Sequence, residues 1–584
     1  MPLNRWPQLC ENPAYRNSPV KRAVVLFLAA LLLLHAELTF AASRSPVRGK
    51  RGMVVSADEY ATQVGVSILA KGGNAVDAAV AVGFALAVTH PSAGNIGGGG
   101  FMLVRPAKTG ETMAIDYREK APRRATRDMY LDKQGNVVPE LSTVGYKAAG
   151  VPGTVAGLAL ALEKYGTMKL SELIQPSINL AEKGIVVRHT LARSLRQSAA
   201  LLSRFPDSHS LFLRQGRYFE EGNLLVQKDL ARTLRTIAQS GPSAFYDGPI
   251  AELIVADMER HGGLVTREDL KTYQPRLRPA IKGLYRGYEI CSMPPPSSGG
   301  IALLEMLNIL EPYPLANYGH NSSRTLHLMA EAMRLAFRDR AEFLGDSDFV
   351  KVPVAGLIAK KYAAQLRLGI DPYLAAESRK MAPGRPTAYE SAETTHYSIV
   401  DAAGNAVANT YTLNGSYGGG ATVHQAGFLL NNEMDDFSSK PGNPNMFGLV
   451  QGEANAIAPN KRPLSAMTPT IVTKENRLFL VTGSPGGPTI INTVLQVLIN
   501  VIDFKRTLQE AVDAPRIHHQ WLPDRLSLER GGFPIDVVDA LKGRGHTIEW
   551  VDAMGDAHSI MIEAETAVRL GAADPRRNGL ALGY

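Results

Sequence analysis

Cysteine is scarce in this sequence, whose 584 residues include only Cys10 and Cys291. Cys10 lies in a segment that we expect to be removed, so we predict no intrachain disulfide and a buried, small apolar role for Cys291. The motifs H-E-x-x-H and paired C-x-x-C are missing, and adjacent His518 and His519 would point to opposite faces of a strand. The sequence therefore supports no metal site, and no cofactor is expected.

The motif G-x-S-x-G is also missing, which removes the local signature of serine α/β-hydrolases. The glycine-rich run at residues 94–100 precedes a predicted strand instead of joining a strand to a helix, so we do not expect nucleotide binding. The net charge is +8, but basic and acidic residues are interspersed. That pattern does not indicate a nucleic-acid partner.

The N-terminus has the pattern of a secretory signal. Lys21 and Arg22 precede an apolar run at residues 23–34, which is shorter than the about 20 residues that a membrane-spanning helix needs, and small residues follow it. We predict cleavage after Ala41, which makes residues 1–41 a signal peptide and places the protein in the periplasm or outside the cell. An uncleaved signal anchor is the alternative.

The remaining chain has the composition of a soluble globular protein, with 45% hydrophobic and 20% charged residues overall. Helices come first, and a polar, proline-bearing stretch at 361–393 then predicts an exposed connector. Strands dominate afterwards, which favours a layered α+β fold over a doubly wound parallel sheet. The predicted helices are 59–70, 75–89, most of 151–333, 490–504 and 508–514, and the predicted strands are 101–105, 112–118, 394–400, 406–413, 427–430, 470–473 and 478–482.

Thr394 opens a predicted strand directly after the connector. By themselves, residues 394–413 are explained by two ordinary strands of a hairpin, in which threonine is favoured. Self-cleavage before Thr394 would give it a second role as an N-terminal nucleophile. A threonine hydroxyl needs a base, and a free α-amino group, with a pKa near 7.7–8.0, supplies one on the same residue.

Residues 394–418 resemble the signature of the γ-glutamyltransferase family, which belongs to the N-terminal-nucleophile hydrolases. The resemblance implies an α+β fold, the four-layer αββα sandwich, formed jointly by a large fragment (42–393) and a small one (394–584) after cleavage between Glu393 and Thr394. Seven further segments resemble family motifs in the family's order: 72–79, 97–101, 116–119, 294–300, 431–437, 482–487 and 514–521.

The resemblance also implies how a γ-glutamyl substrate is held. Arg118 matches the arginine that binds the α-carboxylate, a task suited to a planar bidentate donor, and Ser465 adds a hydroxyl. Asp436 matches the carboxylate that binds the α-ammonium, with Glu433 and Asn414 beside it. These roles follow from the resemblance alone.

The catalytic roles are implied in the same way. Thr394 is the nucleophile, Thr412 hydrogen-bonds it, and Gly486 and Gly487 form the oxyanion hole, where glycine lets the backbone approach closely. Two further positions depart from the family pattern. Ala466 stands where a second serine is frequent, and Phe447 stands where a tyrosine is frequent in the loop over the pocket.

The implied activity is transfer of the γ-glutamyl group of glutathione or related γ-glutamyl compounds, through an ester on Thr394, to water, amino acids or dipeptides. Ala466 leaves open an alternative within the superfamily, an acylase acting on glutaryl or cephalosporin-type amides. A precursor that never matures and serves as a periplasmic binding protein is the rival from another class.

Overall fold

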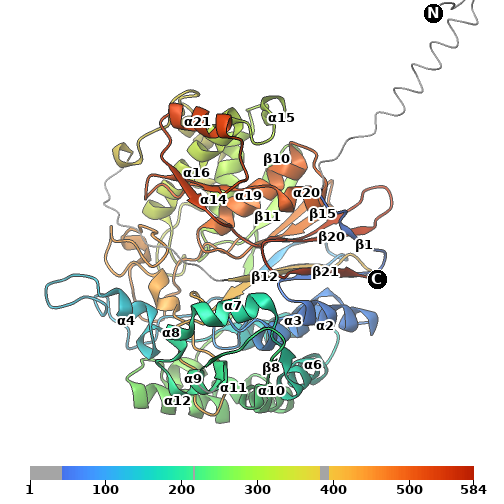
Figure 1. Cartoon of the computed structure of the whole chain (residues 1–584), viewed down its shortest axis with the longest axis vertical. Helices are drawn as coiled ribbons and strands as arrows, with labels where there is room; N and C mark the ends of the chain where they lie inside the picture. The colour runs from blue at the N-terminus through green and yellow to red at the C-terminus, as the bar shows by residue number, and fades with distance from the viewer. Residues whose placement is uncertain (1–42, 215–216, 382–393) are drawn as a thin grey trace, which may run out of the picture. The chain divides into compact units, whose positions relative to one another are not determined.

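Two seven-stranded antiparallel sheets form the centre of the protein and pack face to face (Figure 1). The computed structural model describes residues 43–214, 217–381 and 394–584, and all of its elements lie in the unit Ser45–Tyr584. The predicted signal peptide at 1–41 and the proposed cleavage residue Glu393 lie outside the described residues. Within the described ranges, no helix is both long enough and apolar enough to span a membrane.

The two sheets have these strands in spatial order. The first contains β1 (Val47–Gly49), β20 (Arg569–Ala573), β19 (His558–Ile562), β15 (Arg477–Thr482), β14 (Thr470–Lys474), β11 (Tyr288–Ser292) and β10 (Ile281–Tyr285). The second contains β21 (Leu580–Gly583), β2 (Met53–Ser56), β12 (Thr395–Val400), β13 (Ala406–Thr412), β3 (Gly99–Arg105), β4 (Met113–Tyr117) and β9 (Arg276–Pro279). Each sheet therefore joins strands that precede residues 382–393 to strands that follow them.

Helices cover the outer face of each sheet and complete the αββα order (Figure 1). On the side of the second sheet, its strands contact α2 (Glu59–Ala70), α3 (Ala75–Thr89) and α5 (Thr154–Tyr165), while α6 (Leu170–Lys183) packs on α3 and α10 (Lys228–Ser240) packs on α6. On the side of the first sheet, its strands contact α14 (Gly299–Leu310) and α20 (Leu508–Asp513), while α16 (Ser323–Phe343) and α19 (Thr489–Ile502) pack on α14. The four-layer α+β prediction is confirmed.

Smaller elements complete the described chain. The helices are α4 (Pro139–Thr143), α7 (His189–Gln197), α8 (Ala199–Leu202), α9 (Pro206–Phe212), α11 (Ser243–Tyr246), α12 (Pro249–His261), α13 (Arg267–Lys271), α15 (Leu315–Tyr318), α17 (Val354–Leu357), α18 (Lys360–Arg367) and α21 (Ile535–Gly543), with 3-10 turns η2 (Tyr146–Ala148), η3 (Ser378–Lys380), η4 (Glu433–Asp436) and η5 (Glu453–Asn455). The short strands are β5 (Ile185–Val186), β6 (Leu213–Arg214), β7 (Arg217–Tyr218), β8 (Leu224–Leu225), β16 (Ile517–His518), β17 (Leu526–Glu529) and β18 (Ile548–Val551).

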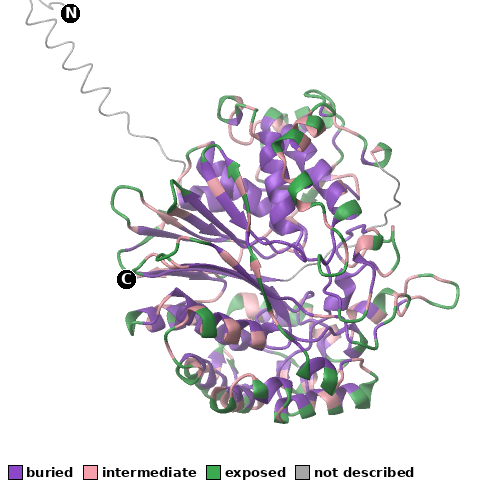
Figure 2. Cartoon of the chain, turned by 180° about the vertical axis from the view of Figure 1, so that it is seen from behind, coloured by how far each residue is buried: buried purple, intermediate pink, exposed green. Residues whose placement is uncertain are grey.

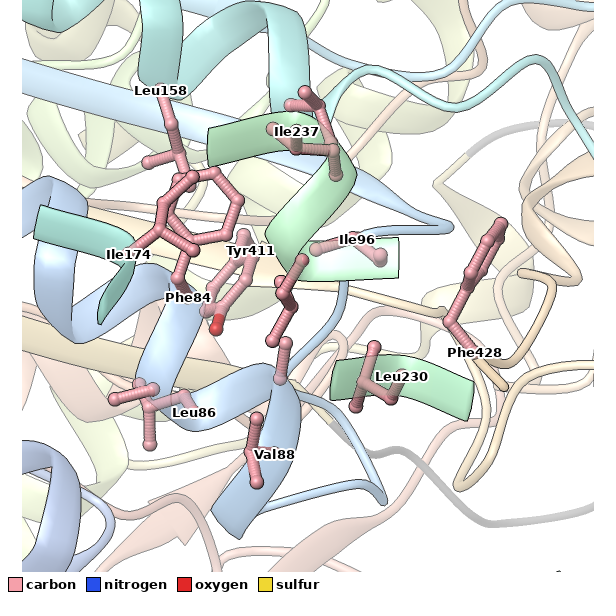
Figure 3. Packing of buried hydrophobic residues seen from close by; sticks show 14 of the residues in the cluster. Phe84, Leu86, Val88, Ile96, Leu158, Ile174, Leu230, Ile237, Tyr411 and Phe428 are labelled. Carbon is pink, nitrogen blue, oxygen red and sulfur yellow. The ribbon is translucent and has the colours of Figure 1, made fainter. Parts of the chain in front are cut away.

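The hydrophobic core is layered like the fold. One apolar cluster fills the space between the sheets, where Phe101 and Leu103 of β3 join Ile471 of β14. A second lies between the second sheet and its helices, and Figure 3 shows Phe84 of α3 beside Tyr411 of β13. Figure 2 shows that the central strands of both sheets are mostly buried, whereas the edge strands β1, β9 and β10 have exposed residues. Strands covered on both faces lose the alternation of polar and apolar residues, which explains the continuous apolar runs in their sequences.

The α3 helix shows why this sequence folds locally as it does. Asn74 caps its start and forms a capping box with Asp77, which satisfies backbone donors that would otherwise lack partners. Every residue of α3 is buried, as expected for a helix that is apolar on all sides. The predicted boundaries of α2 and α3 are confirmed at both ends.

The region 151–333 is mostly helical, as predicted, but it also contains the strands β9, β10 and β11, which the sequence prediction missed. The two-residue hairpin turn at Arg286 and Gly287, with φ of 48° and 82°, is the signal for β10 and β11. Two further parts of the sequence prediction are wrong. Residues 427–430 form no strand and make only the bridge between Thr422 and Leu429. The predicted connector begins as helix α18, and Ser378 within it is fully buried because it bonds to Arg334 and Asp524.

Candidate active site

The hairpin of β12 and β13 brings Thr394 and Thr412 to the same end of the second sheet. Thr395 pairs with Tyr411, so Thr394 and Thr412 are the next residues along the two strands, and both are buried. They line one small cavity with most of the residues named from the sequence: Arg118, Asn414, Glu433, Asp436, Phe447, Ser465, Ala466 and Gly487. Gly486 lines an adjoining cleft that shares Phe447 and Pro488 with this cavity.

Arg118, just beyond β4, forms the charged centre of the cavity. Its guanidinium is fully buried, donates to Glu433 and to Asp436, and also donates through Nε to the carbonyl of Pro463 at 3.2 Å. The turn η4 presents Glu433 and Asp436 from the same side. The group predicted to bind a carboxylate is therefore joined directly to the groups predicted to bind an ammonium.

Burial dominates the electrostatics around Arg118. It raises the pKa of Glu433 well above its usual value, although Arg118 opposes the shift. Desolvation likewise raises the pKa of Glu119 to about 7, and Arg118 Nη1 lies 3.8 Å from that carboxylate. The carboxylate pair Glu433 and Asp436 raises the pKa of Arg118, which keeps the guanidinium charged despite its burial. The cavity thus contains a cation, the guanidinium of Arg118, which is paired with the carboxyl groups around it.

The glycine run at residues 94–100 supports the end of β13 at Thr412. A side chain on Gly98 would place a Cβ 2.1 Å from the carbonyl oxygen of Thr412, so glycine is required for this approach. Asn95 donates to the same carbonyl at 2.8 Å. The hydroxyl of Thr412 accepts from the backbone N–H of Asn414 at 2.8 Å, and Asn414 has a positive φ of 78°. The run therefore positions Thr412 rather than a phosphate.

The segment 483–487 forms the sharp turn between β15 and α19. Gly486 and Gly487 have φ of 129° and 51°, and a Cβ on Gly486 would lie 2.4 Å from the hydroxyl of Thr489. The hydroxyl of Ser484 accepts from the backbone N–H of Asp556 at 2.9 Å, which anchors the turn. The positive end of the α19 dipole lies directly after the turn, a favourable environment for a developing oxyanion.

Ser465 is held by the proline-rich motif at residues 294–300. Its carbonyl accepts from both the N–H and the hydroxyl of Ser298, at 2.8 and 2.6 Å, and its own hydroxyl accepts from the N–H of Met467 at 3.1 Å. Ala466 and Phe447 are buried apolar residues at the same cavity. The motif at residues 294–300 thus fixes one wall of the site.

Arg340 is a residue of the cavity that the sequence analysis missed. It lies on α16, is 2% exposed, and donates through Nε to the hydroxyl of Ser298 at 2.9 Å. Its Nη1 has no hydrogen-bond partner among the described residues. Burial lowers the pKa of Arg340 to about 10, so the side chain remains a cation at neutral pH. In sequence, Arg340 is one basic residue in a charged helix, and only the packing of α16 reveals it.

The predicted burial of Cys291 is confirmed by the structure. Cys291 on β11 is buried, and burial raises the pKa of its thiol to about 11. His518 and His519 make separate hydrogen bonds: His518 contacts Asn492 and Gln520, whereas His519 accepts from the N–H of Trp521 and contacts Asp524. The two adjacent rings therefore have different partners.

Comparisons with known proteins place this arrangement among its relatives. The model of the γ-glutamyltranspeptidase family matches residues 61–584. The glutathione hydrolase proenzyme of Escherichia coli (strain K12) is 52% identical over 541 residues, which cover 92% of this chain and 93% of that protein. The crystal structure of cephalosporin acylase from Bacillus halodurans is similar with a TM-score of 0.84 and 30% identity, covering 94% of this chain and 98% of that one. The crystal structure of Helicobacter pylori γ-glutamyltranspeptidase has 47% identity, a TM-score of 0.56, and covers 61% of this chain and 99% of its own.

Proposed function

This chain belongs to the γ-glutamyltranspeptidase family, and we propose that it is a glutathione hydrolase and γ-glutamyltransferase that matures by cleavage between Glu393 and Thr394. Maturation begins when the Thr394 hydroxyl attacks the Glu393 carbonyl and the acyl group moves from nitrogen to oxygen. Water then hydrolyses that ester, which frees the α-amino group of Thr394. The fragments 42–393 and 394–584 stay together because they share both sheets.

In turnover, the free α-amino group of Thr394 takes the proton of its own hydroxyl. The hydroxyl oxygen attacks the γ-carbonyl carbon, and the N–H groups of Gly486 and Gly487 stabilise the oxyanion that forms. The γ-amide bond then breaks, and the leaving amine takes the proton. Water or the amine of an amino acid or dipeptide resolves the γ-glutamyl ester and regenerates Thr394.

The observation that carries the substrate assignment is the contact of Arg118 with both Glu433 and Asp436. A group that carries a carboxylate and an ammonium on one carbon can replace this contact without loss, because Arg118 receives the carboxylate and the acids receive the ammonium. A glutaryl group has no ammonium, so its binding to Arg118 would leave buried acids without a partner, and such a loss costs several kcal/mol. This cost favours a γ-glutamyl donor over the acylase alternative. The acylase is kept as the second candidate because the fold is similar to that of cephalosporin acylase.

We also propose that the protein works outside the cytoplasm, in the periplasm or as a secreted enzyme. The support is the signal pattern of residues 1–41.

The deciding experiment sequences the N-terminus of the smaller fragment of purified protein and then compares turnover of γ-glutamyl and glutaryl anilides. We expect a fragment that begins at Thr394 and a clear preference for the γ-glutamyl anilide. A different start would overturn every catalytic role, and a preference for the glutaryl anilide would establish the acylase. A single uncut chain that is inactive on both would support the binding-protein rival.

A further inference from the structure

Three ligand-type side chains meet in a buried cluster beside α16, outside the proposed catalytic cavity. His327 and Glu331 lie one turn apart on α16, and His546 lies between α21 and β18. All three are buried, and their nearest ligand atoms lie within 4.8 Å of one another. We propose that His327, Glu331 and His546 bind a divalent transition-metal ion, with Zn²⁺ as the best match to two imidazoles and one carboxylate.

The hydrogen bonds of His327 prepare it as a ligand. Its Nε2 lies 2.7 Å from the carbonyl oxygen of Asp371, which can only accept, so Nε2 carries the proton. Nδ1 therefore presents its lone pair to Nε2 of His546, 2.9 Å away. A ligating histidine that donates its other N–H to a backbone carbonyl is the usual arrangement around a bound metal.

The spacing of the cluster requires only a small adjustment. Ligand atoms about 2.0–2.1 Å from a tetrahedral ion lie roughly 3.3 Å apart, so the two imidazoles must separate by a few tenths of an ångström. The proton of His546 Nε2 then moves, by exchange with solvent, to Nδ1 of the same ring. Both imidazoles therefore bind as neutral groups.

The carboxylate of Glu331 is held only by long contacts. Its oxygens lie 3.3 Å from Arg334 Nε, 3.3 Å from Arg334 Nη2 and 3.3 Å from the backbone N–H of Ala376. Arg334 makes its closer contacts with Asp524 and Ser378. Asp524 therefore compensates the charge of Arg334 and leaves Glu331 as the negative group for a cation. Arg544, another nearby cation, is partly exposed and donates to the carbonyl of Pro372.

The position of the cluster gives the ion a structural role. His327 and Glu331 precede the proposed cleavage site, whereas His546 follows it, so the ion would link the two proposed fragments. Asp371 and Ala376, which contact the ligands, belong to the last described stretch before residue 382. The role of the ion as a link between two fragments rests on the proposed cleavage before Thr394. Metal binding itself does not depend on that cleavage, so an experiment can contradict one proposal without contradicting the other.

The test uses purified, full-length protein that has been stripped with a chelator and titrated with Zn²⁺ alone. We expect one equivalent to bind by calorimetry and elemental analysis, a visible absorption band when Co²⁺ replaces Zn²⁺, and a higher thermal midpoint with Zn²⁺. His546→Gln keeps a donor for His327 Nδ1 but removes the imidazole ligand. We expect this variant to bind Zn²⁺ about 100-fold or more weakly, to lose the Co²⁺ band, and to keep its basal activity.

His320→Gln is the matched control, because His320 is a partly buried histidine that contacts Arg506 outside the cluster. It should bind Zn²⁺ as the unmodified protein does. Failure of the unmodified protein to bind Zn²⁺ would overturn the proposal, and so would equal binding by His546→Gln. If Zn²⁺ binds but the chain proves to be uncut, the metal site stands and the linking role is lost.

Discussion

The guanidinium of Arg118 donates directly to the carboxylate of Asp436, although these two groups are proposed to bind opposite charges of the substrate. Substrate binding must therefore exchange one buried ion pair for two. A ligand that supplies both charges is favoured, because it gives Arg118 and Asp436 each a new partner. A ligand with only a carboxylate would pair with Arg118 and leave the charge of Asp436 uncompensated. We therefore expect this contact to make the site selective for a zwitterionic head group.

The first prediction concerns Asp436→Asn. An amide cannot compensate an ammonium, so kcat/KM for a γ-glutamyl anilide should fall by about 10–100-fold, the equivalent of one charge-assisted hydrogen bond. The small activity on a glutaryl anilide should change much less, because that substrate has no ammonium. Asp435→Asn is the control, since Asp435 accepts from Ser142 and Met446. Equal losses on both anilides in Asp436→Asn would contradict the assigned role.

The second prediction concerns Thr412→Val. The Thr412 hydroxyl accepts from the N–H of Asn414, and we propose that it also positions Thr394. Loss of one hydrogen bond should slow both self-cleavage and turnover by roughly tenfold. Gel densitometry during maturation and steady-state kinetics of the matured enzyme measure the two rates. Thr410→Val changes a buried threonine on the same strand that contacts His396, and it should mature at a nearly normal rate.

The third prediction concerns Arg340→Gln. If the Nη1 group of Arg340 helps to hold the donor's α-carboxylate where Ala466 supplies no hydroxyl, its removal should raise KM about tenfold or more while kcat changes less. The loss should be smaller in an Ala466→Ser background, because serine restores a donor. Arg338→Gln alters a neighbouring arginine that pairs with Asp339, and KM should stay unchanged. Identical losses in both backgrounds would indicate that Arg340 only supports Ser298.

The fourth prediction concerns stability in acid. Burial lowers the pKa of His518 from its ordinary 6.5 to about 4. Between these values the unfolded chain binds more protons, so the stability that neutral His518 contributes above pH 6.5 is lost as the pH falls towards 4. The loss amounts to about 3 kcal/mol at most. Thermal midpoints between pH 7.5 and 4.5 should therefore fall less steeply in His518→Gln than in the unmodified protein.

The control for this experiment is His424→Gln, because His424 lies at the surface beside Asp207. Its pH profile should follow that of the unmodified protein. If all three profiles have the same slope, buried His518 does not contribute to acid sensitivity.

Local signals in the sequence were sufficient for much of the fold. The apolar run of α3 gave that helix its correct limits, and the two strands of the β12–β13 hairpin were predicted. The strands β9 to β11 were missed because the short turn at Arg286 and Gly287 was not used as a signal. Burial of Ser378 was missed because its partners, Arg334 and Asp524, are distant in the sequence.

The sequence by itself, through its resemblance to the γ-glutamyltransferase family, determined which residues to expect around Thr394. Only the tertiary structure decided how they interact: that Arg118 contacts Glu433 and Asp436, that Gly98 lets the backbone of Thr412 approach, and that Arg340 reaches the cavity. The physical reason is that ion pairs, close backbone approaches and buried charges depend on distances between segments hundreds of residues apart. Local propensity and periodicity contain no information about those distances.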